Sequence, residues 1–163
     1  MIKRKKLLIG LILLLCISLM TGCPKLSFIS SDKECYEMSK ELLEYLDSND
    51  AEGIESMLCD ITKAAPDTEE EIIAAMEFFD GKVTSRDREL IGSQESVRKG
   101  ETVYLSLSSY IKNVETDKNK TYKIRFYAQV VNKENASKVG ISKITITDED
   151  GNECVIGEFL ERY

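Results

Sequence analysis

ETVYLSLSSYIKN (residues 101–113) and KTYKIRFYAQVVN (residues 120–132) are the two stretches that decide the fold of this chain. Both alternate apolar and polar side chains with a period of two, which is typical of strands with one buried face. The polar residues 116–119 between them favour a turn, so the two stretches are expected to pair as an antiparallel hairpin. Its apolar face is predicted to be formed by Val103, Leu105, Leu107, Ile111, Tyr122, Ile124, Phe126, Ala128 and Val130.

The opposite face of the hairpin combines tyrosines, small polar residues and cations. It carries Tyr104, Ser106, Ser108 and Tyr110 beside Lys123, Arg125, Tyr127 and Gln129. Tyrosine and arginine are enriched among the residues that dominate binding at interfaces, but the same residue types also suit the solvent face of an ordinary antiparallel sheet. The sequence therefore leaves two interpretations open: a plain solvent face, or a candidate interaction face made of Tyr104, Tyr110, Lys123, Arg125 and Tyr127.

Weaker strand patterns flank this hairpin. Residues 82–91 are predicted to form a weak strand, residues 138–147 a fourth strand, and residues 154–159 a short closing segment. In the fourth strand Val139 and Ile141 are out of phase with Ile144 and Ile146. A bulge or bend near residues 140–143 would bring these side chains back to one apolar face.

Three amphipathic helices are expected before the strands. The first begins at the N-cap Asp32, and the second begins at a capping box formed by Asn49 and Glu52. The third follows the N-cap Asp67, carries three glutamates at its positive end, and stops at Gly81. Their apolar residues recur at steps of three and four and are expected to cover the sheet: Cys35, Met38, Leu42, Tyr45, Leu46, Ile54, Met57, Leu58, Ile61, Ile72, Ile73, Met76 and Phe79.

The N-terminus has the pattern of a bacterial lipoprotein signal peptide. Four basic and no acidic residues precede an apolar run over residues 7–20, and small residues lead into Cys23. The segment 19–23, LMTGC, resembles a lipobox, in which the cysteine thiol receives a diacylglycerol before cleavage. The run is shorter than the roughly twenty apolar residues of a membrane-spanning helix, and it lacks the Ala-x-Ala cleavage site of an ordinary secretory signal. Lipidated Cys23 would hold the protein durably on the outer face of the cell membrane, an extracytoplasmic location.

These patterns divide the chain into a signal peptide (residues 1–22), a lipidated tether (residues 23–31) and one α+β domain (residues 32–163). Loss of the four basic residues of the signal peptide leaves 18 basic against 29 acidic side chains, a net charge of −11. Such a charge disfavours nucleic acid as a partner and favours cationic or neutral partners.

Known catalytic and metal-binding patterns are missing from the sequence. The chain has no histidine, which excludes Ser-His-Asp and Cys-His catalysis, and it has neither a dinucleotide-binding nor a P-loop motif. No metal is expected, because the chain has no histidine and Cys35, Cys59 and Cys154 form no CxxC pair. No cofactor is expected either, because no nucleotide-binding motif is found. Cys35 and Cys59 could form a disulfide or remain single buried thiols. Residues 148–153, DEDGNE, are predicted to form a hairpin turn, because their spacing does not fit a calcium loop.

A family resemblance rests on FFDGKV (residues 78–83), on the serine-rich strands that follow, and on VGI (residues 139–141). Over about Ser39 to Phe159 the chain resembles an uncharacterised lipoprotein family of Gram-positive bacteria, domain of unknown function 5104. The resemblance implies the cone-shaped nuclear-transport-factor-2-like fold, also called cystatin-like, with N-terminal helices on a curved antiparallel sheet of four strands or so. It supplies no catalytic residues, since the family has no established activity.

Together these features predict a lipid-anchored protein of the cell surface that binds an unknown protein or small ligand. Two alternatives remain: a carboxylate-based enzyme of small molecules that uses a pocket inside the cone, or a structural homodimer formed through the sheet face. A cone filled by Leu105, Leu107, Ile124 and Phe126 would leave no room for a substrate. A pocket above about 300 Å³ with a buried carboxylate would favour the enzyme.

Overall fold

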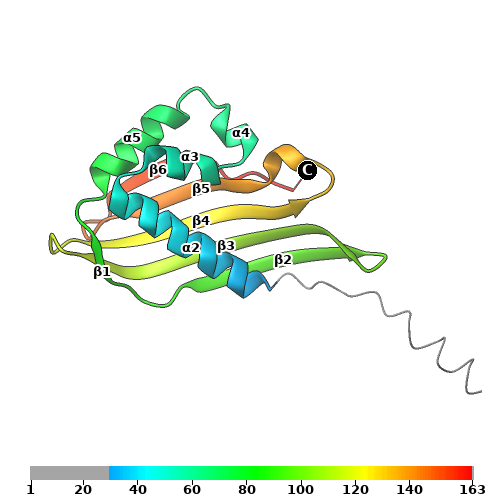
Figure 1. Ribbon diagram of the computed structural model, residues 1–163, viewed down its shortest axis with the longest axis horizontal. Helices are drawn as coiled ribbons and strands as arrows, with labels where there is room; N and C mark the ends of the chain where they lie inside the picture. Colours follow the sequence, from blue (N-terminus) through cyan, green and yellow to red (C-terminus); the bar gives the residue numbers. More distant parts are fainter. Residues whose placement is uncertain (1–29, 163) are drawn as a thin grey trace, which may run out of the picture.

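The protein, described over residues 30–162 by a computed structural model, places four helices on one face of a six-stranded antiparallel sheet (Figure 1). The helices precede the strands in the chain, so the predicted α+β class is confirmed, with more strands than the four or so expected. Cys23, the tether up to residue 29 and the signal peptide lie outside the described residues. Over residues 30–162 no helix is long and apolar enough to cross a membrane.

Four helices are found in the described residues where three were predicted: α2 (Ser31–Ser48), α3 (Ala51–Met57), α4 (Asp60–Lys63) and α5 (Thr68–Phe78). The second predicted helix is divided into α3 and α4, because Leu58 and Cys59 between them are extended. The first N-cap is Ser30 rather than Asp32, and α5 ends earlier than expected, with its C-cap at Phe79, two residues before Gly81. The capping box expected at Asn49 is wrong. Asn49 ends α2 in the left-handed conformation (φ 54°), and the carboxylate of Asp50 accepts the cap hydrogen bond from the Gly53 N–H at 2.9 Å. Asparagine tolerates this conformation better than most residues, which makes it a helix terminator here.

The sheet has the order β1-β3-β4-β5-β6, and β2 also pairs with β3. Its strands are β1 (Val83–Ser85), β2 (Leu90–Arg98), β3 (Glu101–Thr116), β4 (Thr121–Asn132), β5 (Gly140–Thr147) and β6 (Glu153–Gly157). The single weak strand predicted over residues 82–91 is wrong, because β3 is long enough to pair with β1 near one end and with β2 along the rest. The fourth predicted strand starts only at Gly140, since Ala136–Lys138 form a 3₁₀ turn (η1).

The predicted bulge in the fourth strand is confirmed. Tyr127 of β4 lies opposite Lys143, whereas the next residue, Ala128, lies opposite Ile141, so Ser142 is the extra residue on β5. The bulge restores the apolar face as expected. Side chains on both sides of it are buried, with exposed fractions of 0–1 %: Ile141, Ile144 and Ile146.

One apolar core fills the layer between the helices and the sheet. Figure 1 shows α2 running obliquely across the sheet, with α3, α4 and α5 beside it over the part of the sheet formed by β5 and β6. The helices contribute Cys35, Leu42, Leu43, Leu46, Ile54, Leu58, Ile72 and Ala75, and the inner sheet face contributes Leu105, Leu107, Ile111, Ile124, Phe126, Ala128, Ile141, Ile144 and Ile146. Two expected core residues, Ile61 and Ile73, are instead exposed. Side chains therefore occupy the layer in which the enzyme alternative requires a pocket.

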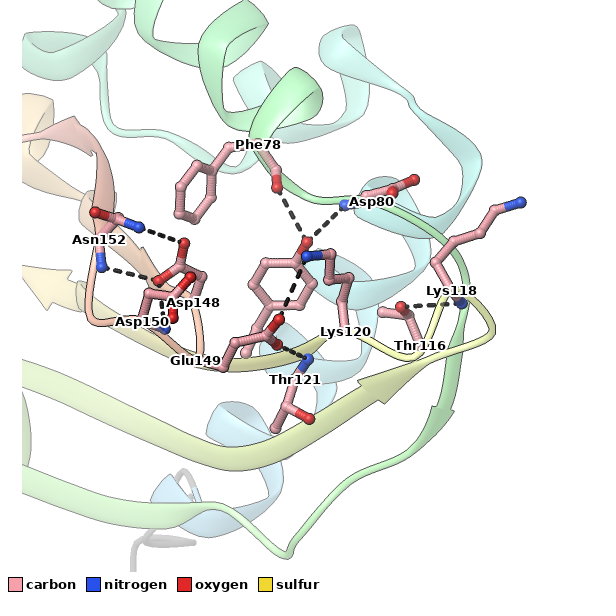
Figure 2. A network of polar contacts seen from close by, with 11 residues as sticks. Phe78, Asp80, Thr116, Lys118, Lys120, Thr121, Asp148, Glu149, Asp150 and Asn152 are labelled. Atoms are coloured by element: carbon pink, nitrogen blue, oxygen red, sulfur yellow. Dashed lines mark hydrogen bonds and ion pairs between the residues drawn. The ribbon is translucent and has the colours of Figure 1, made fainter.

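Polar contacts fasten one end of the sheet to the helices and turns (Figure 2). The Tyr122 hydroxyl donates to the carbonyl oxygen of Phe78 at 3.1 Å and accepts from the Asp80 N–H at 3.0 Å. The Glu149 carboxylate accepts from the Thr121 N–H at 2.8 Å and from the Lys120 ammonium at 3.3 Å. The end of α5 and the turn between β5 and β6 are thereby both tied to the β3–β4 hairpin.

The hairpin turn predicted over residues 148–153 is confirmed. The Asp148 carboxylate accepts hydrogen bonds from the backbone N–H groups of Asp150 and Asn152 and from the Asn152 side-chain amide. These bonds, that of the Asn152 side chain above all, lower the pKa of Asp148 because they favour its charged form. Both carboxylate oxygens thus serve the turn itself.

All three described thiols are free, so the disulfide considered for Cys35 and Cys59 is not formed. Cys35 is fully buried between α2 and the sheet, where burial raises the pKa of its thiol to about 11. Cys59 is also buried, with its sulfur 3.3 Å from the Thr62 hydroxyl. Both behave as core residues rather than as reactive thiols.

Candidate ligand-binding face

Strand register places most of the predicted interaction residues side by side on the sheet face turned away from the helices, here called the outward face. Tyr110 of β3 lies opposite Arg125 of β4, which lies opposite Thr145 of β5. In the next row Ser108 lies opposite Tyr127, which lies opposite Lys143. Residues directly opposite each other are about 4.5–5.5 Å apart at their Cβ atoms. Neighbouring rows of this face are about 6.6–6.8 Å apart along the strands, which is close enough for one ligand to contact both.

Tyr110 organises the cations around it. The guanidinium carbon of Arg125 lies 4.6 Å from the centre of the Tyr110 ring, and the Lys112 ammonium lies 5.2 Å from it. A cation over a tyrosine ring is attracted by the negative face of the ring. Because stacking uses the flat side of the guanidinium, its N–H edge remains able to donate to a ligand.

A cationic hollow of about 340 Å³ lies beside this stack. Its lining comprises Tyr110, Lys123, Arg125, Tyr127, Lys143, Thr145, Thr147 and Glu153. Among the described residues, no carboxylate forms an ion pair with Lys123, Arg125 or Lys143. Glu153, at the far edge of the hollow, is the one acidic side chain in its lining. The hollow is thus locally positive on a strongly acidic protein.

A second hollow, of about 280 Å³, adjoins the first and shares Tyr127 with it. It exists because residues on neighbouring strands are small: Gly92, Ser106 and Ser108. A Cβ atom added at Gly92 would lie only 2.6 Å from the Ser108 hydroxyl. We call it the hydroxyl hollow, because its lining contains serine and tyrosine hydroxyls and no charged side chain.

Residues 158–162 form a strap across the outward face, and Phe159 and Leu160 of this strap line the hydroxyl hollow. The strap's carbonyl oxygens accept hydrogen bonds from sheet-face side chains: Leu160 from Gln129 at 3.2 Å and Arg162 from Asn132 at 3.2 Å. Its Phe159 ring meets Tyr127 edge-on, with 5.3 Å between ring centres. The sequence indicated only a closing segment ending at residue 159. The one hint of the strap's position in the sequence was Gln129 on the outward face, because a polar side chain that is covered by another segment needs a hydrogen-bond partner there.

The strap also explains why the prediction that Tyr104 is exposed is wrong. This tyrosine was expected to be an exposed member of the interaction face, but it is only 5 % exposed. The Arg162 guanidinium lies 4.6 Å from the centre of its ring and donates to the Ser96 hydroxyl at 3.0 Å. Tyr104 is therefore a support of the strap and a wall of the hydroxyl hollow, and Tyr104→Ala would not be the mild change expected of an exposed residue.

The helix side of the protein offers a third hollow, of about 430 Å³, between α3, α4 and α5. Glu52, Glu55 and Glu69 line it, and all three are exposed. The one buried carboxylate within residues 30–162, Glu89, forms an ion pair with Arg86 at 2.8 Å and lines none of these three hollows. No buried acid that a carboxylate-based enzyme would use is found at a hollow described here.

Comparison with known protein families gives a match over most of the domain. Residues 41–149 match the model of the family described as "Domain of unknown function (DUF5104)". The chain belongs to this family. The DUF5104 match spans β2, β3, β4 and β5 and so includes every lining residue of the cationic hollow except Glu153, but it ends before the strap. No curated protein matches the chain.

Proposed function

We propose that this DUF5104 protein is an extracytoplasmic lipoprotein, anchored to the outer face of the cell membrane through Cys23, that binds a ligand on its outward sheet face. Lipidation is supported by the basic, apolar and small residues that lead into Cys23. Ligand binding is supported by one observation above all, the cationic hollow, in which Lys123, Arg125 and Lys143 lack carboxylate partners among the described residues.

This observation carries weight because of the composition of the protein. Acidic side chains outnumber basic ones, 29 to 22 over the whole chain, so a basic side chain has many possible partners. Three cations that line one hollow and have no carboxylate partner repel one another. An anionic group bound between them removes that repulsion. We also propose that the arrangement is the cone-shaped, nuclear-transport-factor-2-like fold, in agreement with helices that precede and cover one face of an antiparallel sheet.

The anchor is tested by Cys23→Ala in the full-length protein expressed in bacteria. Wild type should incorporate an alkyne-tagged fatty acid and partition into the detergent phase, and the variant should do neither, because the thiol is the group that receives the diacylglycerol. Cys59→Ala provides a matched control that removes a different thiol and should label like wild type. Labelling that survives Cys23→Ala would rule out the lipobox.

The binding face is tested by photo-crosslinking in intact cells, with p-benzoylphenylalanine in place of Thr145. Thr145 lies opposite Arg125 and lines the cationic hollow, so the crosslinker should give an adduct with the bound ligand. The same group in place of Glu37, an exposed residue of α2 on the helix side, should give none. Adding Arg125→Gln should abolish the adduct at position 145.

Two results would contradict this proposal. The absence of an adduct at position 145 would contradict ligand binding on the outward face. An adduct at twice the protein mass would instead support the homodimer alternative.

A further inference from the structure

We propose that the ligand of the outward face is an anionic saccharide, with its sugar ring in the hydroxyl hollow and its phosphate or carboxylate group in the cationic hollow. This inference rests on the proposed function and adds the chemical class of the ligand. It derives from the contrast between the two adjoining hollows: one has no charged lining residue, and the other has three cations and the single carboxylate of Glu153.

The two hollows form one continuous site across Tyr127. This side chain lines both, and its strand neighbours Ser108 and Lys143 each line one of them. Arg125 and Tyr127, two residues apart on β4, project from the same face at a separation of about 6.6–6.8 Å. A single small molecule can therefore extend from the hydroxyl hollow to the Arg125 guanidinium.

The hydroxyl hollow has the chemistry of a sugar site. Within residues 30–162, the hydroxyls of Ser106, Ser108 and Tyr127 form no hydrogen bond, although they line the same hollow. Hydroxyls both donate and accept, as sugar hydroxyls do, so the two sets match in either direction. The rings of Tyr127 and Phe159 add apolar walls against which the C–H groups of a sugar ring can pack. At about 280 Å³ the hollow is near the lower limit for small-molecule sites, which suits one sugar unit.

The cationic hollow has the chemistry of a phosphate or carboxylate site. The edge of the Arg125 guanidinium can donate two parallel hydrogen bonds to such a group. Lys143 and Lys123 add flexible donors, and the Thr145 hydroxyl lies on the strand residue opposite Arg125. Three cations serve one anionic group well, whereas nucleic acid would also face the net negative charge of the protein.

An acidic peptide fits the same surface less well. Extended peptides bind mainly by adding a strand to a free sheet edge, where backbone groups are exposed. The two hollows instead open mainly on the face of β3, β4 and β5, whose backbone groups are already paired. The edge strand β2 contributes only Gly92, Ser93 and Gln94, to the hydroxyl hollow.

The inference is tested by calorimetric titration of the full-length protein in detergent at low salt. The probes are glucose 6-phosphate, N-acetylglucosamine 6-phosphate and glucuronic acid, the two uncharged parent sugars, and inorganic phosphate. At least one charged sugar should bind about tenfold more tightly than its parent sugar and than inorganic phosphate, because only the charged sugar fills both hollows. The phosphate and glucuronate arms distinguish the two kinds of anionic group.

Two variants separate the halves of the site. Arg125→Gln should remove most of the advantage of a charged sugar over its parent. Ser106→Leu, which fills the hydroxyl hollow without breaking a hydrogen bond among the described residues, should weaken every sugar and leave inorganic phosphate unchanged. Lys99→Gln removes the same charge from the exposed turn between β2 and β3 and should bind like wild type. Thermal melts should show all three variants folded.

Each outcome decides the question. The proposal of a saccharide ligand would be overturned if charged sugars bind no better than inorganic phosphate. It would also be overturned if Ser106→Leu leaves sugar binding unaffected. If this happens while the crosslink at position 145 still forms, the binding face stands and only the ligand class is wrong. If neither sugar binding nor the crosslink is found, the proposed function fails as well.

Discussion

Gly140→Ala is expected to lower the free energy of unfolding by about 3 kcal/mol or more, through strain and a steric clash together. Gly140 has φ +124°, a conformation that L side chains rarely adopt. A Cβ atom at this position would also lie 2.7 Å from the backbone nitrogen of Cys59 and 2.9 Å from its Cα. The clash is with backbone that cannot easily move, because the Cys59 N–H donates to the carbonyl oxygen of Ile141 at 2.9 Å.

Gly100→Ala is the matched control for this variant. Gly100 also has a positive φ, +78°, but nothing lies within 4 Å of an added Cβ, so only the strain of about 1 kcal/mol should remain. Urea denaturation of both variants gives the comparison. Equal losses would show that the contact between β5 and the start of α4 contributes nothing.

Gly140 also illustrates how far the sequence predicts this fold. The phase change between Ile141 and Ile144 was sufficient to predict a bulge there, because a strand pattern is local and a one-residue shift reverses its faces. The approach of Cys59 to Gly140 was not predicted, since the two residues are far apart in the chain and no periodic pattern links them. For the same reason the division of residues 82–98 into β1 and β2 was missed, because both strands depend on the length of β3.

The candidate site was predictable to a similar extent. Period two alone placed Tyr110, Lys123, Arg125 and Tyr127 on one face, and they line the same hollow there. Lys143 was missed because its position opposite Tyr127 depends on the bulge at Ser142. The strap was missed because some of its contacts use backbone carbonyl oxygens, which are the same in every residue type. Its other contacts join Phe159 and Arg162 to strand residues far away in the chain, and no periodic pattern links them.

The adjacent residues Phe126 and Tyr127 offer the most direct test of which sheet face is core and which is site. Phe126 is fully buried between the helices and the sheet, so Phe126→Ala should cost about 3–5 kcal/mol of unfolding free energy through lost burial and a cavity. Tyr127 is half-buried on the outward face, where its ring contacts Phe159. Tyr127→Ala should cost only about 1–2 kcal/mol, most of it from that ring contact.

The two variants should separate stability from binding. Tyr127→Ala should remain folded and lose the charged sugar, because it removes the one side chain common to both hollows. Phe126→Ala should lose stability in urea denaturation, while any of it that remains folded at low temperature should still bind, because Phe126 lines neither hollow. The opposite pattern, with the larger loss of stability at Tyr127, would mean that the two faces of β4 are assigned the wrong way round. The binding site would then have to be sought on the helix side.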